Sequence, residues 1–127
     1  MPDTILIADD EPNILLSLDY LLRREGYTVL QARDGAEALA QLRAHRPRLV
    51  LLDVMMPVLD GHAVLAALRA DDALKHTRVL MLSAKGRDTD VAKGLGLGAD
   101  AYVTKPFSTQ ALVAQVRALL AGPAAQA

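Results

Sequence analysis

Short apolar runs alternate with longer amphipathic segments along the chain, and this alternation predicts repeated βα units around a parallel sheet. The five apolar runs fall at residues 5–8, 27–32, 49–52, 79–82 and 101–104. The first, third and fourth are apolar throughout, as is typical of strands buried on both faces. We therefore expect these three in the centre of the sheet, and the mixed run at 27–32 and the short run at 101–104 at its edges.

The segments between the runs have the 3.6-residue spacing of amphipathic helices. In the segment that follows the first run, apolar residues fall at positions 14, 15, 18, 21 and 22. Pro12 suits the first turn of this helix and Gly26 its C-terminal stop. Residues suited to cap later helices are Asp34 with Glu37 (a capping-box pattern), Asp60 and Ser108.

The fourth helical segment is the weakest of the five. It is expected to begin near Asp88, but Gly94 and Gly96 interrupt it. An interior glycine costs about 1 kcal/mol relative to alanine, so we expect this helix to fray at its C-terminal end. Residues 122–127 have no periodicity, which indicates a flexible tail or the stub of a linker.

Composition and charge narrow the class of protein. A chain of 127 residues that is 52% hydrophobic can bury the core of one domain, and its lack of cysteine excludes a disulfide framework. No apolar stretch is long enough to span a membrane. The net charge of −1 gives no sign of the basic surface that nucleic-acid binding requires. We expect a cytoplasmic domain that binds neither membrane nor nucleic acid directly. His45, His62 and His76 lack metal-like spacing and are expected to be exposed.

Polar residues follow four of the apolar runs directly. They are Asp9, Asp10, Asp53, Ser83 and Lys105. Because parallel strands end at one edge of a sheet, we expect these side chains to meet there, where open α/β sheets bind ligands. An aspartate can attack phosphorus when its charge is neutralised, Mg²⁺ prefers carboxylate oxygens, and lysine and hydroxyl groups bind phosphoryl oxygens. The set predicts phosphoryl-transfer chemistry at Asp53.

The sequence resembles the receiver domains of bacterial two-component response regulators, including the single-domain chemotaxis regulators. The matching pieces lie at residues 7–12, 52–57 with 60–61, 82–84, and 98–100 through 102–107. The resemblance covers residues 4–121. It implies a flavodoxin-like (βα)5 fold, with strand order 2-1-3-4-5 and helices on both faces, and a domain over residues 1–121.

In that family, residues at these positions have known roles, which the resemblance implies here. Asp53 would accept a phosphoryl group from a sensor histidine kinase or a histidine phosphotransfer protein. Asp10 would bind Mg²⁺, or Mn²⁺ in its place, directly and Asp9 largely through water. Asp53 would contribute one carboxylate oxygen, and the Met55 carbonyl would be a further ligand. Such a domain catalyses its own aspartyl phosphorylation and dephosphorylation, and is not a classical turnover enzyme.

The resemblance also implies a conformational switch. Ser83 and Lys105 would bind the phosphoryl oxygens, Ser83 would move toward them, and Tyr102 would turn inward. This would alter the face formed by the fourth helix, fifth strand and fifth helix, where a partner binds. The Lys105-Pro106 bond is the usual cis-proline site of the family. The domain would be a monomer or a phosphorylation-dependent dimer.

Two positions are expected to tune the lifetime of the phosphoryl group. Met55 and Lys85 lie two residues beyond Asp53 and Ser83, beside the path of an attacking water. Neither has a carboxylate or amide that could position that water. We therefore hypothesise slow self-dephosphorylation, which phosphate loss within seconds, without a phosphatase, would contradict.

Two other functions compete with this one, and the extent of the protein is a separate open question. A phosphatase of the haloacid dehalogenase type would need a second aspartate two residues after the nucleophile, where this chain has Met55. A pseudo-receiver that binds partners without phosphorylation would normally lack one of the acids, the hydroxyl or the lysine. Finally, the chain is either a complete single-domain regulator or a receiver separated from an output domain, with an unknown downstream target in both cases.

Overall fold

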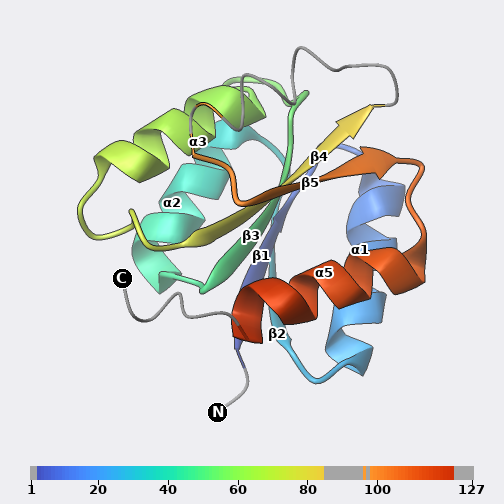
Figure 1. The fold of residues 1–127 in the computed structure, drawn as a ribbon. Coiled ribbons are helices and arrows are strands. Elements are labelled where there is room, and N and C mark those ends of the chain that lie inside the picture. The colour runs from blue at the N-terminus through green and yellow to red at the C-terminus, as the bar shows by residue number, and fades with distance from the viewer. Residues whose placement is uncertain (1–2, 85–95, 97, 122–127) are drawn as a thin grey trace.

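The computed structural model describes residues 3–84, 96 and 98–121. In this part of the chain, five parallel strands form one sheet with the order β2-β1-β3-β4-β5 (Figure 1). The strands are β1 (Thr4–Ala8), β2 (Thr28–Ala32), β3 (Leu49–Asp53), β4 (Arg78–Ala84) and β5 (Ala101–Lys105). The three wholly apolar runs are the central strands and the other two are the edges, so the prediction of strand positions is confirmed.

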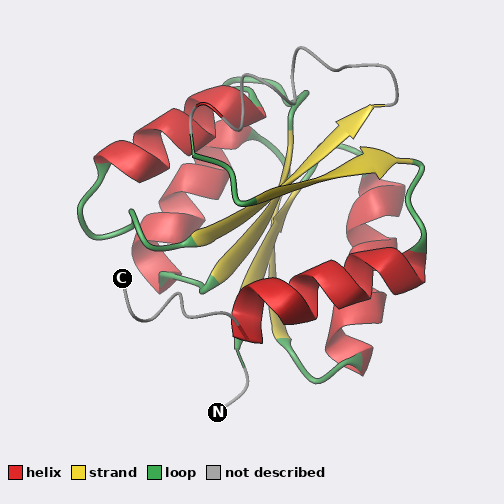
Figure 2. Cartoon of the chain, viewed as in Figure 1, coloured by secondary structure: helices red, strands yellow, loops and turns green. Residues whose placement is uncertain are grey.

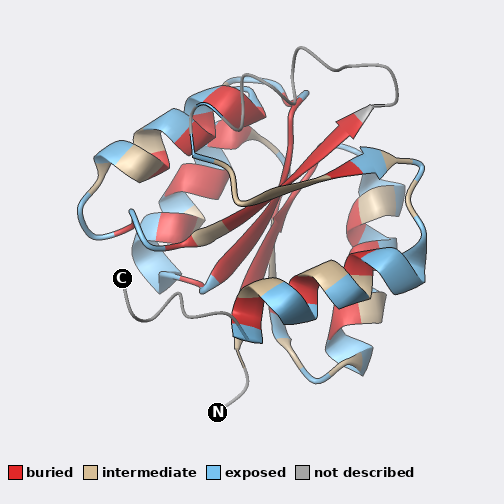
Figure 3. Ribbon diagram, in the orientation of Figure 1, coloured by how far each residue is buried: buried red, intermediate tan, exposed pale blue. Residues whose placement is uncertain are grey.

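Helices cover both faces of the sheet (Figure 2). Those in the described residues are α1 (Pro12–Arg24), α2 (Gly35–His45), α3 (Gly61–Ala70) and α5 (Thr109–Ala121). The helices α1 and α5 pack on one face and α2 and α3 on the other, and each pair covers its own cluster of buried side chains. Figure 3 shows the buried positions along the strands and on the inner sides of the helices. The segment predicted to form a fourth helix lies outside the described residues except for Gly96, and so do Lys85 and the tail.

The ends of the helices largely follow the predicted signals. Pro12 opens α1, and Gly26 follows the helix with a φ of 96°. The Asp34 carboxylate accepts the Glu37 N–H at 2.8 Å, but Glu37 in turn accepts the N–H of Arg33 rather than that of Asp34, so the capping box is displaced by one residue. Asp60 and Ser108 accept the N–H groups of Ala63 and Ala111, as predicted for caps of α3 and α5.

An arginine of α3 fixes the point where β5 begins. The Arg69 guanidinium donates to the Gly98 carbonyl from two nitrogens and also to the Asp100 carboxylate at 2.9 Å. Asp100 in turn accepts from Arg78 and from the Val79 N–H, both at the start of β4. Because Asp100 directly precedes β5, these bonds hold the entry of the edge strand against its neighbour. None of the helices in the described ranges is long and apolar enough to cross a membrane.

Candidate phosphoryl-transfer site

The carboxyl ends of β1, β3 and β5 bring Asp9, Asp53 and Lys105 together. Asp9 directly follows β1 and is fully buried, and its N–H donates to the Ala32 carbonyl at the end of β2. Asp53 is the last residue of β3 and is 5% exposed. Lys105 is the last residue of β5. Strand order and register therefore place these three side chains at one edge of the sheet, as the polar residues after the apolar runs predicted.

Lys105 forms ion pairs with the acids of this cluster. Its Nζ lies 2.9 Å from Oδ2 of Asp9, with which it hydrogen-bonds, and 3.3 Å from Oδ2 of Asp53. Oε1 of Glu11 lies 3.7 Å away. The other oxygen of Asp9 accepts the Glu11 N–H at 2.9 Å, and Oδ1 of Asp53 accepts the Met55 N–H at 3.4 Å. The lysine thus bridges two buried carboxylates that would otherwise repel each other.

Three carboxylates in the described residues could hold a cation together. Asp9, Asp10 and Asp53 each offer an oxygen, and these oxygens lie within 4.8 Å of one another. Asp10 is exposed, while the other two are buried. A hard divalent cation such as Mg²⁺ takes oxygen ligands of this kind and completes its shell with water. The donor set therefore fits Mg²⁺.

The environment of the cluster shifts the pKa values of its charged groups. Burial, followed by repulsion from Asp9, raises the pKa of Asp53 from 3.8 to about 6, although the charge of Lys105 and the Met55 N–H act in the opposite direction. Burial alone would lower the pKa of Lys105, but the hydrogen bond to Asp9 and the charges of Asp53 and Asp9 raise it above 10.5. Lys105 therefore stays protonated at neutral pH, and Asp53 loses its proton just below neutrality.

The other predicted site residues in the described part of the chain lie on β4, on β5 and in the loop after β3. Ser83 lies on β4, is 1% exposed and pairs in register with Thr104 of β5. Tyr102 is partly buried on β5, and the Lys105-Pro106 bond is cis, as expected. Met55 is 56% exposed, which leaves its side chain at the rim of the site.

Sequence reasoning predicted the wrong exposure for His62 and no role for Glu11. His62 was expected to be exposed, but it is 5% exposed, and its Nε2 lies 3.2 Å from the Tyr102 hydroxyl. The prediction was wrong because position 62 falls in the first turn of α3, which packs on the sheet. His45 and His76 are exposed, as expected. Glu11, which follows the acidic pair in sequence, was assigned no role although it reaches Lys105.

The loop after β3 is held tightly against the site. The Gly61 N–H donates to the Val54 carbonyl at 2.8 Å, and a Cβ on Gly61 would lie only 2.3 Å from the backbone oxygen of Asp53. Glycine is therefore required where α3 begins. Val58, in the same loop, has a φ of 71° and is 74% exposed. This conformation is unfavourable for a β-branched residue, and such outliers often occur beside functional sites.

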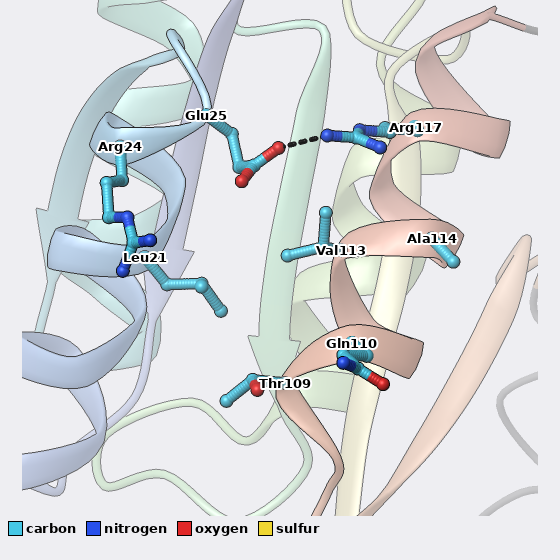
Figure 4. A pocket seen from close by; sticks show the side chains of 8 residues that line it. All are labelled: Leu21, Arg24, Glu25, Thr109, Gln110, Val113, Ala114 and Arg117. Carbon is cyan, nitrogen blue, oxygen red and sulfur yellow. Dashed lines mark hydrogen bonds and ion pairs between the residues drawn. The ribbon is translucent and has the colours of Figure 1, made fainter.

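A groove between α1 and α5 is separate from this cluster (Figure 4). Leu21 and Val113 face each other across it, and an ion pair between Glu25 and Arg117 spans one end. Thr109 lies toward the other end. None of the predicted site residues lines the groove.

Comparison with known proteins identifies the class to which this fold and acidic site belong. The family model for the response regulator receiver domain matches residues 5–117. The response regulator GtcR of Aneurinibacillus migulanus is 45% identical over 120 residues, which are 94% of this chain and 48% of that protein. The chain thus spans about half the length of the curated relatives it matches.

Two solved structures show the same fold. The chemotaxis response regulator CheY4 of Vibrio cholerae has a TM-score of 0.88 and 30% identity, covering 94% of this chain and 99% of that one. The receiver domain of the sensor histidine kinase PA1611 from Pseudomonas aeruginosa has a TM-score of 0.88 and 26% identity, covering 96% of this chain and all of that one. The chain belongs to the response regulator receiver domain family.

Proposed function

We propose that Asp53 accepts a phosphoryl group and that this modification switches the domain between two states. The observation that carries the proposal is the contact of the Lys105 ammonium with both Asp9 and Asp53, beside a cluster of three carboxylates that fits Mg²⁺. Membership of a family of phosphorylation-controlled regulators supports the same reading. The donor would be a phosphohistidine of a sensor histidine kinase or a histidine phosphotransfer protein.

The reaction transfers one phosphoryl group from nitrogen to oxygen. A carboxylate oxygen of Asp53 forms a bond to phosphorus while the bond from phosphorus to the imidazole nitrogen of the donor breaks, and the electron pair of that bond stays on the nitrogen. Lys105 binds a phosphoryl oxygen as a point charge, and the Ser83 hydroxyl donates to another. Positioning and positive charge dominate catalysis of such transfers.

The metal ion would be Mg²⁺, held by Asp10 directly, Asp9 largely through water, Asp53, and the Met55 carbonyl. When bound, it offsets the negative charge of the acids and of the transferred oxygens. The receiver domain of PA1611 has a magnesium ion coordinated in its active-site cleft, which supports the same assignment here. Mn²⁺ would substitute because it accepts the same oxygen ligands.

Acetyl phosphate tests the proposal without a partner kinase. Incubation with acetyl phosphate and Mg²⁺ should add one phosphoryl group, acid-stable and base-labile, as measured by mass spectrometry. Asp53→Asn should abolish the addition, and chelation of the metal should strongly reduce it. Asp72→Asn is the matched control, because the Asp72 side chain is 97% exposed. Unchanged labelling in Asp53→Asn would refute the assignment, and no labelling of the wild type would favour a pseudo-receiver.

The proposal also covers how long the phosphoryl group stays on Asp53 and how its presence is passed on to a partner. Met55 is exposed beside Asp53 and has no group that could position a water, so we expect slow self-dephosphorylation; Lys85 lies outside the described residues. Ser83 and Tyr102 would relay the modification to the face formed by the fourth helix, β5 and α5, whether residues 1–121 act alone or with an output domain. Relatives such as the DNA-binding response regulator MtrA are about twice as long, so an attached DNA-binding output is the second reading.

A further inference from the structure

Tyr102 on β5 is hydrogen-bonded to a buried side chain on another element. His62 lies in the first turn of α3, is 5% exposed, and has its Nε2 3.2 Å from the Tyr102 hydroxyl. Tyr102 also packs against the apolar cluster that lies under α2 and α3. We propose that His62 is a positioning residue for Tyr102, and that α3 thereby sets where the tyrosine ring lies.

Two further contacts join this pair to the acidic cluster. On one side, Gly61 precedes His62, and its backbone lies so close to Asp53 that a Cβ would come within 2.3 Å of the Asp53 backbone oxygen. On the other side, β5 runs from Tyr102 to Lys105, whose Nζ is 3.3 Å from Asp53 Oδ2. The hydrogen bond closes a ring of contacts that leaves Asp53 through α3 and returns to it through β5. The two partners of the bond therefore lie on elements that both touch Asp53.

The need to fill space in the core does not by itself explain a histidine bonded to a tyrosine at this place. An imidazole and a phenol cost free energy when buried unless they are hydrogen-bonded, whereas a leucine would fill a similar volume without that requirement. A hydrogen bond of typical net strength changes a two-state ratio by about fivefold. His62 thus favours the ring position in which the hydroxyl points to α3. The importance of that position for signalling rests on the proposed function.

Substitutions at both ends of the bond test the proposal. His62→Leu removes the hydrogen bond but fills a similar volume with an apolar side chain. His62→Gln places an amide nitrogen near the position of Nε2, and Tyr102→Phe removes the hydroxyl. The chain has three tyrosines, so Tyr102→Phe also identifies the Tyr102 ring signals in carbon–proton NMR spectra. Exposed His45 provides the matched control, as His45→Leu. Spectra are recorded with Mg²⁺, with and without beryllofluoride as a phosphoryl mimic.

We expect His62→Leu to shift the Tyr102 ring signals and to change the ratio of ring positions by about fivefold, before and after the mimic is added. His62→Gln should restore the wild-type signals, and His45→Leu should leave them unchanged. Tyr102 signals that are identical in His62→Leu and wild type would overturn the proposal. So would an effect of His62→Leu on the free energy of unfolding that is equally large in a Tyr102→Phe background, since a bond between the two cannot be lost twice.

If His62→Leu does not fold, the comparison of wild type, His62→Gln and Tyr102→Phe still decides the matter. A ratio of ring positions in Tyr102→Phe equal to that in the wild type would then count against positioning, because that variant lacks the hydroxyl that makes the bond. Labelling by acetyl phosphate reports on the proposed function separately. In the protein without the mimic, the proposed effect of His62 on the Tyr102 ring signals does not require that Asp53 can be phosphorylated. The two proposals can therefore fail independently.

Discussion

Replacement of Asp53 by asparagine should stabilise the metal-free protein. The wild-type carboxyl has its pKa raised from 3.8 to about 6, first by burial and then by repulsion from Asp9. A carboxyl whose pKa is raised on folding supports stability at low pH and loses that support as pH rises through the folded value. Above about pH 6, the folded protein therefore carries a carboxylate charge that its surroundings disfavour. Asparagine has nearly the same shape and never carries this charge.

The size of the effect follows from the shift itself. The rise in the pKa of Asp53 from 3.8 to about 6 corresponds to about 3 kcal/mol, which sets an upper limit on the gain in the free energy of unfolding for Asp53→Asn at about pH 7.5. At about pH 5, where the folded carboxyl is mostly protonated, the gain should fall to roughly half. Addition of Mg²⁺ should narrow the difference further, because a ligand that binds the native state stabilises it and the variant has lost one of the proposed ligand groups.

Urea denaturation followed by circular dichroism provides the assay, in a chelator at both pH values and then with Mg²⁺. Asp72→Asn serves as the control, since its side chain is 97% exposed and its change should stay within about 0.5 kcal/mol. An Asp53→Asn variant no more stable than wild type at the higher pH, with an unchanged dependence on urea, would contradict this prediction. A gain of the same size at both pH values would contradict it too.

Three other substitutions test different parts of the site. Lys105→Met should raise the pKa of Asp53 beyond about 6, as followed by carboxyl NMR, because the lysine charge lowers it; an unchanged pKa would show that the two groups do not interact. Gly61→Ala should cost about 2–3 kcal/mol in urea denaturation because its Cβ would overlap the Asp53 backbone oxygen, whereas Gly96→Ala, with nothing within 4 Å, should not destabilise. Arg69→Lys should cost about 2–4 kcal/mol, since lysine cannot reproduce the guanidinium bonds to several acceptors; a loss under about 0.5 kcal/mol would contradict this.

The fold could be predicted because its signals are local and repeated. The apolar runs at 5–8, 49–52 and 79–82 are buried on both faces, and only a central strand of a covered sheet meets that requirement. Caps such as Asp60 are equally local, since one carboxylate and one N–H three residues later suffice. The displaced capping box at Glu37 shows what the sequence does not predict. The sequence gives the position of the carboxylate along the chain, but the backbone geometry decides which N–H group donates to it.

The members of the site were predictable for a similar reason, while their contacts were not. Asp9, Asp53 and Lys105 each follow or end a parallel strand, so topology alone brings them to one edge. His62 does not follow a strand, and a lone histidine in an amphipathic segment is compatible with either an exposed or a buried position. Its partner is 40 positions away in sequence, and only the packing of α3 beside β5 brings them together.

The charge balance of the site supports the proposal that Lys105 and a metal ion act there together. Lys105 contacts Asp9 and Asp53 and yet leaves the pKa of Asp53 about two units above its ordinary value, so one ammonium does not compensate for burial and two acids. Its position is fixed by β5, and it lies on one side of the carboxylates. A divalent cation held partly by the exposed Asp10 would add positive charge from the solvent side. With the cation bound, the charge of the Asp53 carboxylate would be offset on both sides, as the proposed attack on a phosphoryl group requires.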